Sequence, residues 1–137
     1  MKSGGKSVKL ETVDTWFSKM VRIEAADEHG MVRCFICDVP LHWAEAVVAH
    51  YIKRRHMATR FLKKNVHPAC GECNGKDEYN PTTQMAHTIA INEYDMGTAE
   101  ELHLLQNKEE HYGKTGLTQM GECFRDEFKR IKKIKGL

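Results

Sequence analysis

Apolar residues recur at helical spacing near the start of the chain, at positions 13, 16, 17, 20 and 21. Steps of three and four residues place these side chains on one face of an α-helix, so the pattern predicts an amphipathic helix. Thr12 is placed to cap its N-terminus, and Asp14 lies in its first turn. The polar segment 27–30 should end it. The apolar stripe consists of Val13, Trp16, Phe17, Met20 and Val21.

The middle of the chain has shorter apolar runs, of the kind that form strands. Residues 31–37 should form a short strand that leads into a pair of cysteines. Residues 47–52 have the β-branched and aromatic content of another strand, and apolar residues in 61–66 suggest its partner across a basic loop. Because proline is tolerated in a first helical turn, Pro68 should open a short helix. The expected order is strand, basic loop, strand, helix.

The C-terminal part of the chain is predicted to be helical throughout. Asn80 followed by Pro81 is typical of a helix start, and Thr98 begins a capping-box pattern ahead of further apolar residues. A last helix, from about Leu117, carries an apolar stripe in which Cys123 should be buried, because free cysteine is among the most buried residue types. That stripe includes Met120, Phe124, Phe128 and Ile131.

The composition indicates one ordinary domain, with 137 residues, 41% of them apolar, no internal repeat and no Pro- or Ser-rich linker. We expect an α+β fold in which residues 1–10 form a flexible tail and residues 11–80 the N-terminal helix and the core. Residues 81–137 form a helical region of the same domain or an appended element. The N-terminus lacks the apolar core of a signal peptide and no run could span a membrane, so a cytoplasmic protein is expected.

Four of the five cysteines form two Cys-x-x-Cys pairs, Cys34 with Cys37 and Cys70 with Cys73. In a reducing compartment such pairs are more often metal ligands than disulfides. Two pairs complete the tetrahedral four-thiolate site that structural Zn²⁺ prefers. The 32 residues between the pairs exceed the spacing of a simple zinc ribbon. The zinc should therefore be a scaffold around an inserted element that carries the chemistry.

Positive charge is concentrated between the cysteine pairs, although the net charge of the chain is only +2. Six cations occupy 12 positions, and no Asp or Glu lies among them. Contact with nucleic-acid phosphates explains this run better than a solvated surface, which usually mixes both signs. The basic end of the last helix is either a solvated face or a further phosphate contact. The six cations are Lys53, Arg54, Arg55, Arg60, Lys63 and Lys64.

The inserted element also carries His50 and Asn65, and Asn74 follows the last cysteine of the second pair. This arrangement resembles the HNH, or ββα-metal, nuclease motif. More specifically, Ala-His-Tyr-Ile-Lys-Arg-Arg-His-x-Ala-Thr-Arg-Phe at 49–61 and Asn-Val-His-x-x-Cys-x-x-Cys-Asn at 65–74 look like the phage recombination nucleases called NinG or Rap. The N-terminal helix and the helical tail are similar to that family too, so the resemblance covers nearly the whole chain.

The resemblance implies a zinc-bound ββα-metal core and a role for each matching residue. His50 matches the general base, which would deprotonate a water for attack on a phosphodiester. Asn65 matches the asparagine that steadies the hairpin. Asn74 matches a ligand of a catalytic Mg²⁺ or Mn²⁺, which would stabilise charge on the scissile phosphate. The four paired cysteines match structural zinc ligands.

Ala49 departs from the motif, because many HNH enzymes place an Asp or His before the general base as the other cation ligand. A single asparagine does not hold a cation alone, so a substitute is expected. His67 is the first candidate, since it lies two residues from Asn65 on the same strand face, and His56 in the loop is the second. Histidine ligands would favour Mn²⁺ or a later transition metal over Mg²⁺.

The cysteine pairs, the basic run and the motif residues predict a metal-dependent DNA endonuclease, and the resemblance implies that it hydrolyses branched recombination intermediates such as Holliday junctions or D-loops. No helix has side chains suited to base edges, which favours recognition of DNA structure over sequence. An HNH nickase or restriction-type enzyme on linear duplex is one alternative, and a non-catalytic zinc module that binds DNA is another, favoured by Ala49. Symmetric junction cleavage calls for two active sites and so for a homodimer. The helical region would supply dimerisation, DNA contact or both, with recombination proteins as further partners and the host cell as the location if the chain is phage-encoded.

Overall fold

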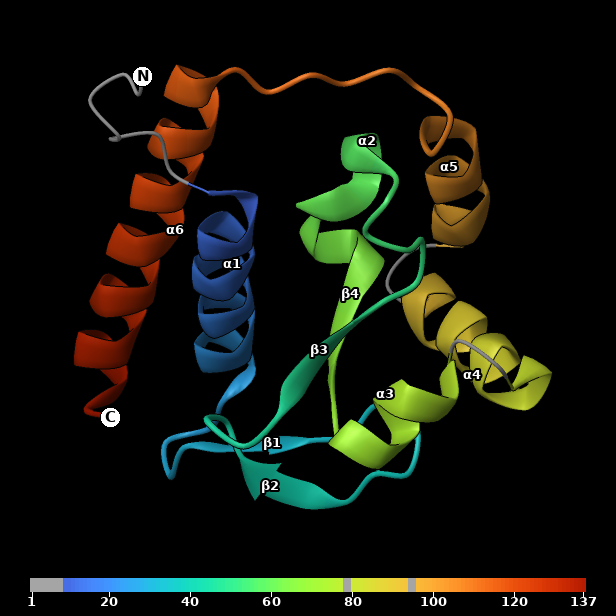
Figure 1. Cartoon of the computed structure of the whole chain (residues 1–137). Helices are drawn as coiled ribbons and strands as arrows, with labels where there is room; N and C mark the ends of the chain where they lie inside the picture. The colour runs from blue at the N-terminus through green and yellow to red at the C-terminus, as the bar shows by residue number, and fades with distance from the viewer. Residues whose placement is uncertain (1–8, 78–79, 94–95) are drawn as a thin grey trace.

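The computed structural model describes residues 9–77, 80–93 and 96–137 of the chain. Within these residues the chain forms six α-helices and two small antiparallel sheets of two strands each, which confirms the α+β class. Most of the expected tail, residues 1–8, lies outside the described residues. Figure 1 shows a central hairpin of β3 (Val47–His50) and β4 (Val66–Ala69) with helices on both sides. None of the described helices is long and apolar enough to cross a bilayer.

The predicted N-terminal and last helices pack against each other. α1 (Leu10–Ala25) and α6 (Lys114–Lys135) lie side by side and run in the same direction (Figure 1). Their apolar faces meet each other and the hairpin, and this burial provides most of the stability of such helices. The ring centroid of Phe17 lies 5.1 Å from that of Phe124 and 5.6 Å from that of Phe61. The main core therefore joins the two ends of the described chain to the insert.

The end of α6 is tied to the end of α1 by one side chain. Nζ of Lys135 donates hydrogen bonds to the carbonyl oxygens of Ile23, Glu24 and Ala26 at 3.0, 2.7 and 2.7 Å. The last carbonyls of a helix lack partners within the helix and carry partial negative charge. The ammonium group therefore caps α1 from outside.

Helix boundaries agree with the sequence prediction only in part. Asn80 caps α4 (Pro81–Asn92) as expected, because its side-chain oxygen accepts the backbone N–H two residues on at 2.9 Å. Thr12 does not cap α1, which begins two residues earlier. Thr98 is the first residue of α5 (Thr98–Leu105) rather than its cap, since Gly97 takes that position with a φ of 100°.

Cys123 corrects another expectation, because its side chain is exposed rather than buried. α6 begins three residues earlier than predicted, at Lys114. Its core-facing side follows Phe124, Phe128 and Ile131, each in contact with the main core. Cys123 precedes Phe124 by one position and so turns away from this stripe by about 100°.

The order strand, strand, helix in the middle of the chain is confirmed. β3 and β4 pair antiparallel, with Ala49 opposite His67 and His50 opposite Val66. α3 (Gly71–Asp77) follows β4 directly. Successive residues of a strand face opposite sides of the sheet, so this register assigns each of these four side chains to one face.

The connection between β3 and β4 is more structured than the expected loop. It contains α2 (Met57–Arg60) and the 3-10 helix η2 (Lys63–Asn65), and the second strand begins only at Val66. Pro68 lies inside β4 and does not open α3. β4 is hydrogen-bonded to a partner strand on one side only, and an edge position tolerates a residue without an N–H.

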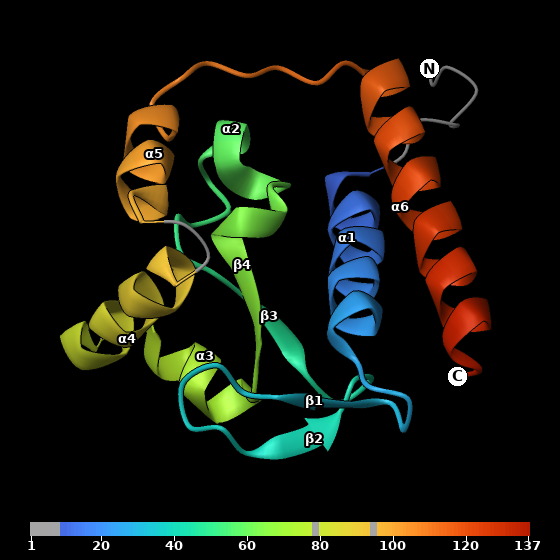
Figure 2. The ribbon, with the colours of Figure 1, turned by 180° about the vertical axis from the view of Figure 1, so that it is seen from behind.

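A second ribbon, which the periodicity does not reveal, presents the first cysteine pair. β1 (Met31–Arg33) pairs with β2 (Pro40–His42), and strands of three residues are too short to show alternation. Figures 1 and 2 show this ribbon and α3 at the same end of the hairpin. The N–H of Phe35 donates to the carbonyl of Pro68 at 3.1 Å, which joins the ribbon to β4.

Candidate functional site

The two cysteine pairs meet at that end of the hairpin. Cys34 and Cys37 lie in the turn between β1 and β2, Cys70 lies immediately before α3, and Cys73 lies within α3. Their four Sγ atoms all lie within 4.8 Å of one another, and Sγ of Cys37 is 3.9 Å from Sγ of Cys70. Zn–S bonds of ~2.3 Å in a tetrahedron place sulfurs about 3.8 Å apart. The four thiols therefore fit one zinc ion.

The electrostatics of the cluster also suit a cation. Burial alone would raise the pKa of the Cys34 thiol, but backbone N–H groups of Cys37, Cys70 and Ile36 lower it to about 7. Burial and the neighbouring thiols raise the pKa of Cys73. Like charges this close do not ionise together unless a positive charge offsets them. In the described part of the chain, no other group of three or more His, Cys, Asp or Glu side chains is close enough to hold a metal.

His50 ends β3 with its ring on the face that meets α1, 6.4 Å from the ring of Phe17. Its Nε2 lies 3.0 Å from the carbonyl oxygen of Arg60. A carbonyl only accepts hydrogen bonds, so Nε2 carries the proton and Nδ1 keeps its lone pair. Burial, aided by the charge of Arg54, lowers the pKa of His50 to about 4. The imidazole is therefore an unprotonated base at neutral pH.

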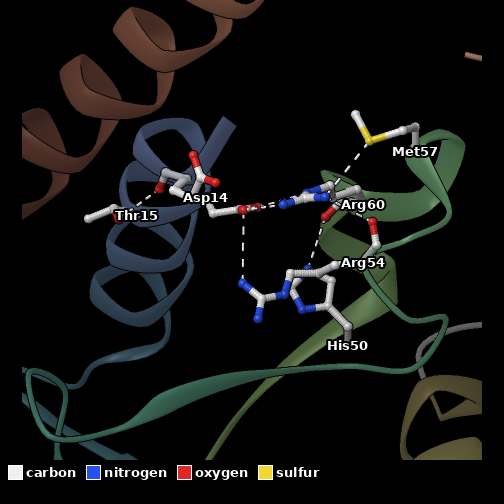
Figure 3. A network of polar contacts seen from close by, with 7 residues as sticks. Asp14, Thr15, His50, Arg54, Met57 and Arg60 are labelled. Atoms are coloured by element: carbon white, nitrogen blue, oxygen red, sulfur yellow. Dashed lines mark hydrogen bonds and ion pairs between the residues drawn. The ribbon is translucent and has the colours of Figure 1, made fainter. Parts of the chain in front are cut away.

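A network of charged side chains surrounds this imidazole (Figure 3). Asp14 of α1 accepts a hydrogen bond from Nε of Arg60 at 3.0 Å and forms an ion pair with the terminal nitrogen of the same guanidinium. Arg54 lies 3.9 Å from the same carboxylate, and Arg60 donates to the carbonyl of Arg54 at 3.0 Å. Asp14 and Arg60 are nearly buried, whereas 61% of the Arg54 side chain is exposed. An anion near His50 would therefore meet Arg54 first.

Asn65 is completely buried and joins the two ends of the insert. Its side-chain oxygen accepts from the N–H of Ile52 at 2.8 Å, and its amide nitrogen donates to the carbonyls of Ile52 and Thr59 at 2.9 and 3.1 Å. Its own carbonyl accepts from the N–H of Tyr51. These bonds hold the chain that leaves β3 against the chain that enters β4, and so they fix the position of His50.

Replacing Asn65 by alanine should lower the free energy of unfolding by about 2–3 kcal/mol, because three buried backbone groups lose their partner. Urea unfolding followed by tryptophan fluorescence measures this loss. Asn92→Ala is the matched control, since the side-chain oxygen of Asn92 accepts a hydrogen bond from a single backbone N–H among the described residues, that of Ala99 at 3.0 Å. Equal losses for the two variants would contradict a special role of Asn65 in holding the insert.

His67, the first candidate for a second cation ligand, does not lie beside the ring of His50. His67 lies opposite Ala49, on the other face of the hairpin from His50, with its ring 5.3 Å from that of Phe35. Burial lowers the pKa of His67 to about 4, and its Nδ1 is buried without a hydrogen-bond partner among the described residues. Asn65 belongs to η2, so the expectation that it shares a strand face with His67 is wrong.

The other two expected cation ligands lie on different elements. Nδ1 of His56 lies 3.2 Å from the carbonyl oxygen of Gln106, beyond the end of α5. Asn74 lies on α3 and is half-buried. The catalytic cation thus stays a prediction from the sequence. Of its expected ligands, Asn74 is the one that directly follows a cysteine of the cluster.

The basic run is more balanced in charge than its sequence suggests. Four of its six cations lie within 4.0 Å of carboxylates that come from elsewhere in the chain. Lys63 is 2.8 Å from Glu24 of α1, and Lys64 forms an ion pair with Glu101 of α5. Arg55 is exposed, and no ion pair is recorded for it within the described ranges. Contact with DNA remains a prediction for all six cations. Of the three arginines in this run, Arg54 and Arg55 are exposed and Arg60 is not.

Asp14 is the site residue that the sequence pattern did not single out. It lies three positions before Phe17 and one after Val13, beside the buried stripe of α1. A carboxylate next to a buried stripe usually has a partner, because an unpaired buried charge is costly. The position of Asp14 beside this stripe therefore indicates an ion pair with a distant segment.

Comparison of the chain with protein-family models, with curated proteins and with solved structures finds no match. The chemistry of the site therefore has to be inferred from its own residues.

Proposed function

We propose that the protein is a metal-dependent DNA endonuclease of the HNH type that cleaves branched recombination intermediates. The observation that carries this proposal is the arrangement of His50 on a strand–strand–helix unit closed by four cysteines. The imidazole ends the first strand, a backbone carbonyl holds its tautomer, and an exposed guanidinium lies beside it. A neutral base next to a cation suits attack of water on a phosphodiester.

In the proposed reaction, Arg54 binds a non-bridging oxygen of the scissile phosphate, and Nδ1 of His50 takes a proton from a water. The water oxygen bonds to phosphorus while the P–O3′ bond breaks, O3′ takes a proton from a solvent water, and His50 later returns its proton to solvent, which leaves a 5′-phosphate and a 3′-hydroxyl. The bound phosphate raises the pKa of His50 from about 4 towards neutrality, which makes the imidazole a stronger base. Arg60 positions the ring through its carbonyl and does not touch substrate.

A divalent cation would supply charge stabilisation at the leaving oxygen when bound. In this proposal Asn74 would hold it together with waters and phosphate oxygens, because the described residues offer no second cluster of three His, Cys, Asp or Glu side chains. His67 and His56 stay as predicted additional ligands.

A second candidate, a non-catalytic zinc module that binds DNA, is favoured by one observation. Ala49 is completely buried where the motif has a cation ligand, and His67 across from it faces away from His50. A protein that had lost the cation would keep the zinc cluster and the basic surface. Binding without hydrolysis would then be its function.

Replacing His50 by alanine should slow cleavage of a four-way junction by about 10²-fold with either Mg²⁺ or Mn²⁺, because the general base is lost. His29→Ala is the matched control, since that side chain is 77% exposed and outside the network. Cleavage is measured on a labelled junction and on a linear duplex of the same sequence. For the wild type, kcat/KM should hold down to about pH 5, as the pKa of about 4 in the free protein requires.

Each outcome separates the candidates. Cleavage unchanged by His50→Ala would show that His50 is not the base. Binding of DNA without cleavage in either metal would favour the zinc module. Equal rates on the junction and the linear duplex would favour a nickase or restriction-type enzyme.

A further inference from the structure

A pocket of about 320 Å³ lies between the basic segment after β3 and the helices α4 and α5. Figure 1 places these helices on the side of the hairpin away from α1, so the pocket is separate from the Asp14 network. Tyr51, Lys53 and Arg55 line it from one side, and Met85 of α4 and His103 of α5 line it from the other. Its volume is at the small end of the range for ligand sites, which suits one small ligand or one unit of a polymer.

The charge of the pocket is suited to an anion. Two cations line it, and no carboxylate is among the residues that the structure describes in its wall. Nζ of Lys53 donates to the carbonyl of His50 at 3.2 Å, which places this edge of the pocket next to the end of β3. This edge of the pocket therefore lies beside the backbone of His50, whose ring faces α1.

Hydrogen bonds hold the rings in the pocket wall. The hydroxyl of Tyr51 lies 2.7 Å from Nε2 of His103 and accepts from the hydroxyl of Thr88 at 3.3 Å. The amide nitrogen of Gln106 lies 3.2 Å from Nδ1 of His103. The His103 ring is exposed, and 66% of Met85 is exposed across from it. A flat ring and a polarizable thioether form the kind of surface on which a nucleobase stacks.

We infer that this pocket binds one nucleotide of a single-stranded nucleic acid, with its phosphate on Arg55 and Lys53 and its base against His103 and Met85. In a duplex the bases are stacked inside, so a duplex backbone would use the cations but not the ring wall. A splayed strand at a branch point or an end uses both. This inference rests on the nucleic-acid binding of the proposed function but not on cleavage.

The test is fluorescence anisotropy of the full chain with a labelled oligo(dT) strand and with a duplex of the same length, without divalent cation. Arg55→Gln should lower the slope of log K against log salt for the single strand by about 0.7, as for one lost phosphate contact. Arg33→Gln is the matched control, since Arg33 is an exposed arginine on β1 outside the pocket, and its slope should stay unchanged.

Loss of stacking should be specific to the single strand. His103→Ala should weaken binding of oligo(dT) by about fivefold or more and leave duplex binding within twofold, because one stacked base is lost. Met85→Ala, at an exposed position, repeats the test without touching the hydrogen bonds of the wall. Thymidine monophosphate should compete better than inorganic phosphate at equal charge.

Three results would overturn the inference. The variants could lose equal affinity for the single strand and the duplex, or His103→Ala or Met85→Ala could bind oligo(dT) as tightly as the wild type. Inorganic phosphate could also compete as well as thymidine monophosphate. Failure of the proposed nuclease function is distinguishable from these results. A protein that does not cleave can still show the single-strand effect, and a protein whose pocket variants bind normally can still lose cleavage on His50→Ala.

Discussion

Replacing Cys70 by alanine should unfold the hairpin end of the protein and abolish stoichiometric zinc binding. The cluster joins three segments, the β1–β2 turn, the end of β4 and α3, around small buried residues: Cys34, Ala49 and Ala69. Such a small apolar core provides little stability by itself. Metal binding to four thiolates contributes on the order of 10 kcal/mol to folding. Most of the stability of this end should therefore come from the ion.

Zinc content, thermal unfolding followed by circular dichroism, and hydrogen exchange measure this effect. Cys123→Ala is the matched control, because that cysteine is exposed on α6 and outside the cluster. It should keep one zinc per chain and the wild-type melting temperature. Exchange in Cys70→Ala should accelerate in β3 and β4, while α1 and α6 keep part of their protection through their own core. A Cys70→Ala protein that retains one zinc and melts within a few degrees of the wild type would contradict the four-cysteine site.

Replacing Asp14 by alanine should lower the free energy of unfolding by about 3–5 kcal/mol, because the Arg60 guanidinium would keep its charge in a nearly buried position without a carboxylate partner. Only 12% of the Asp14 side chain and 13% of the Arg60 side chain are exposed. The loss should also reach His50, whose ring is held by the carbonyl of Arg60. Urea unfolding by tryptophan fluorescence measures the first effect, and junction cleavage the second.

Glu24→Gln is the matched control on the same helix. Glu24 is 44% exposed and pairs with Lys63, which is 54% exposed, so its loss should cost at most about 1 kcal/mol. A double variant, Asp14→Leu with Arg60→Met, should recover most of the stability, since replacing both charges by apolar groups removes the unpaired cation. A cost for Asp14→Ala as small as that for Glu24→Gln would show that the guanidinium finds water or another partner.

The parts of the fold that the sequence predicts well have strong local signals. α1 has a continuous apolar stripe. The two Cys-x-x-Cys pairs indicate thiolate ligands at the spacing that a four-cysteine metal site needs. The Asn80–Pro81 helix start is likewise a local signal. Each of these depends on side chains a few positions apart, so no knowledge of the tertiary structure is needed.

The parts that it misses depend on distant contacts. β1 lies within the predicted strand at 31–37, but its partner β2 is not predicted, because pairing with β1 and the bond from Phe35 to β4 stabilise this ribbon. The charge balance of the basic run depends on Asp14, Glu24 and Glu101, which lie far from it in sequence. The register of β3 and β4 decides which face of the hairpin His50 and His67 lie on. Strands of four residues are too short for their sequence to specify that register.

The bonds from Lys135 to the end of α1 span 109 to 112 positions. During synthesis at roughly 5–20 residues per second, α1 leaves the ribosome on the order of 5–20 s before the helix that covers it. Until then the apolar stripe of α1 can pack against the hairpin through Phe61, but the side of the stripe that meets Phe124 and Phe128 of α6 is uncovered. A newly made chain should therefore be able to bind zinc before the main core around His50 is complete, and any function that depends on the position of the His50 ring should wait until α6 has been made.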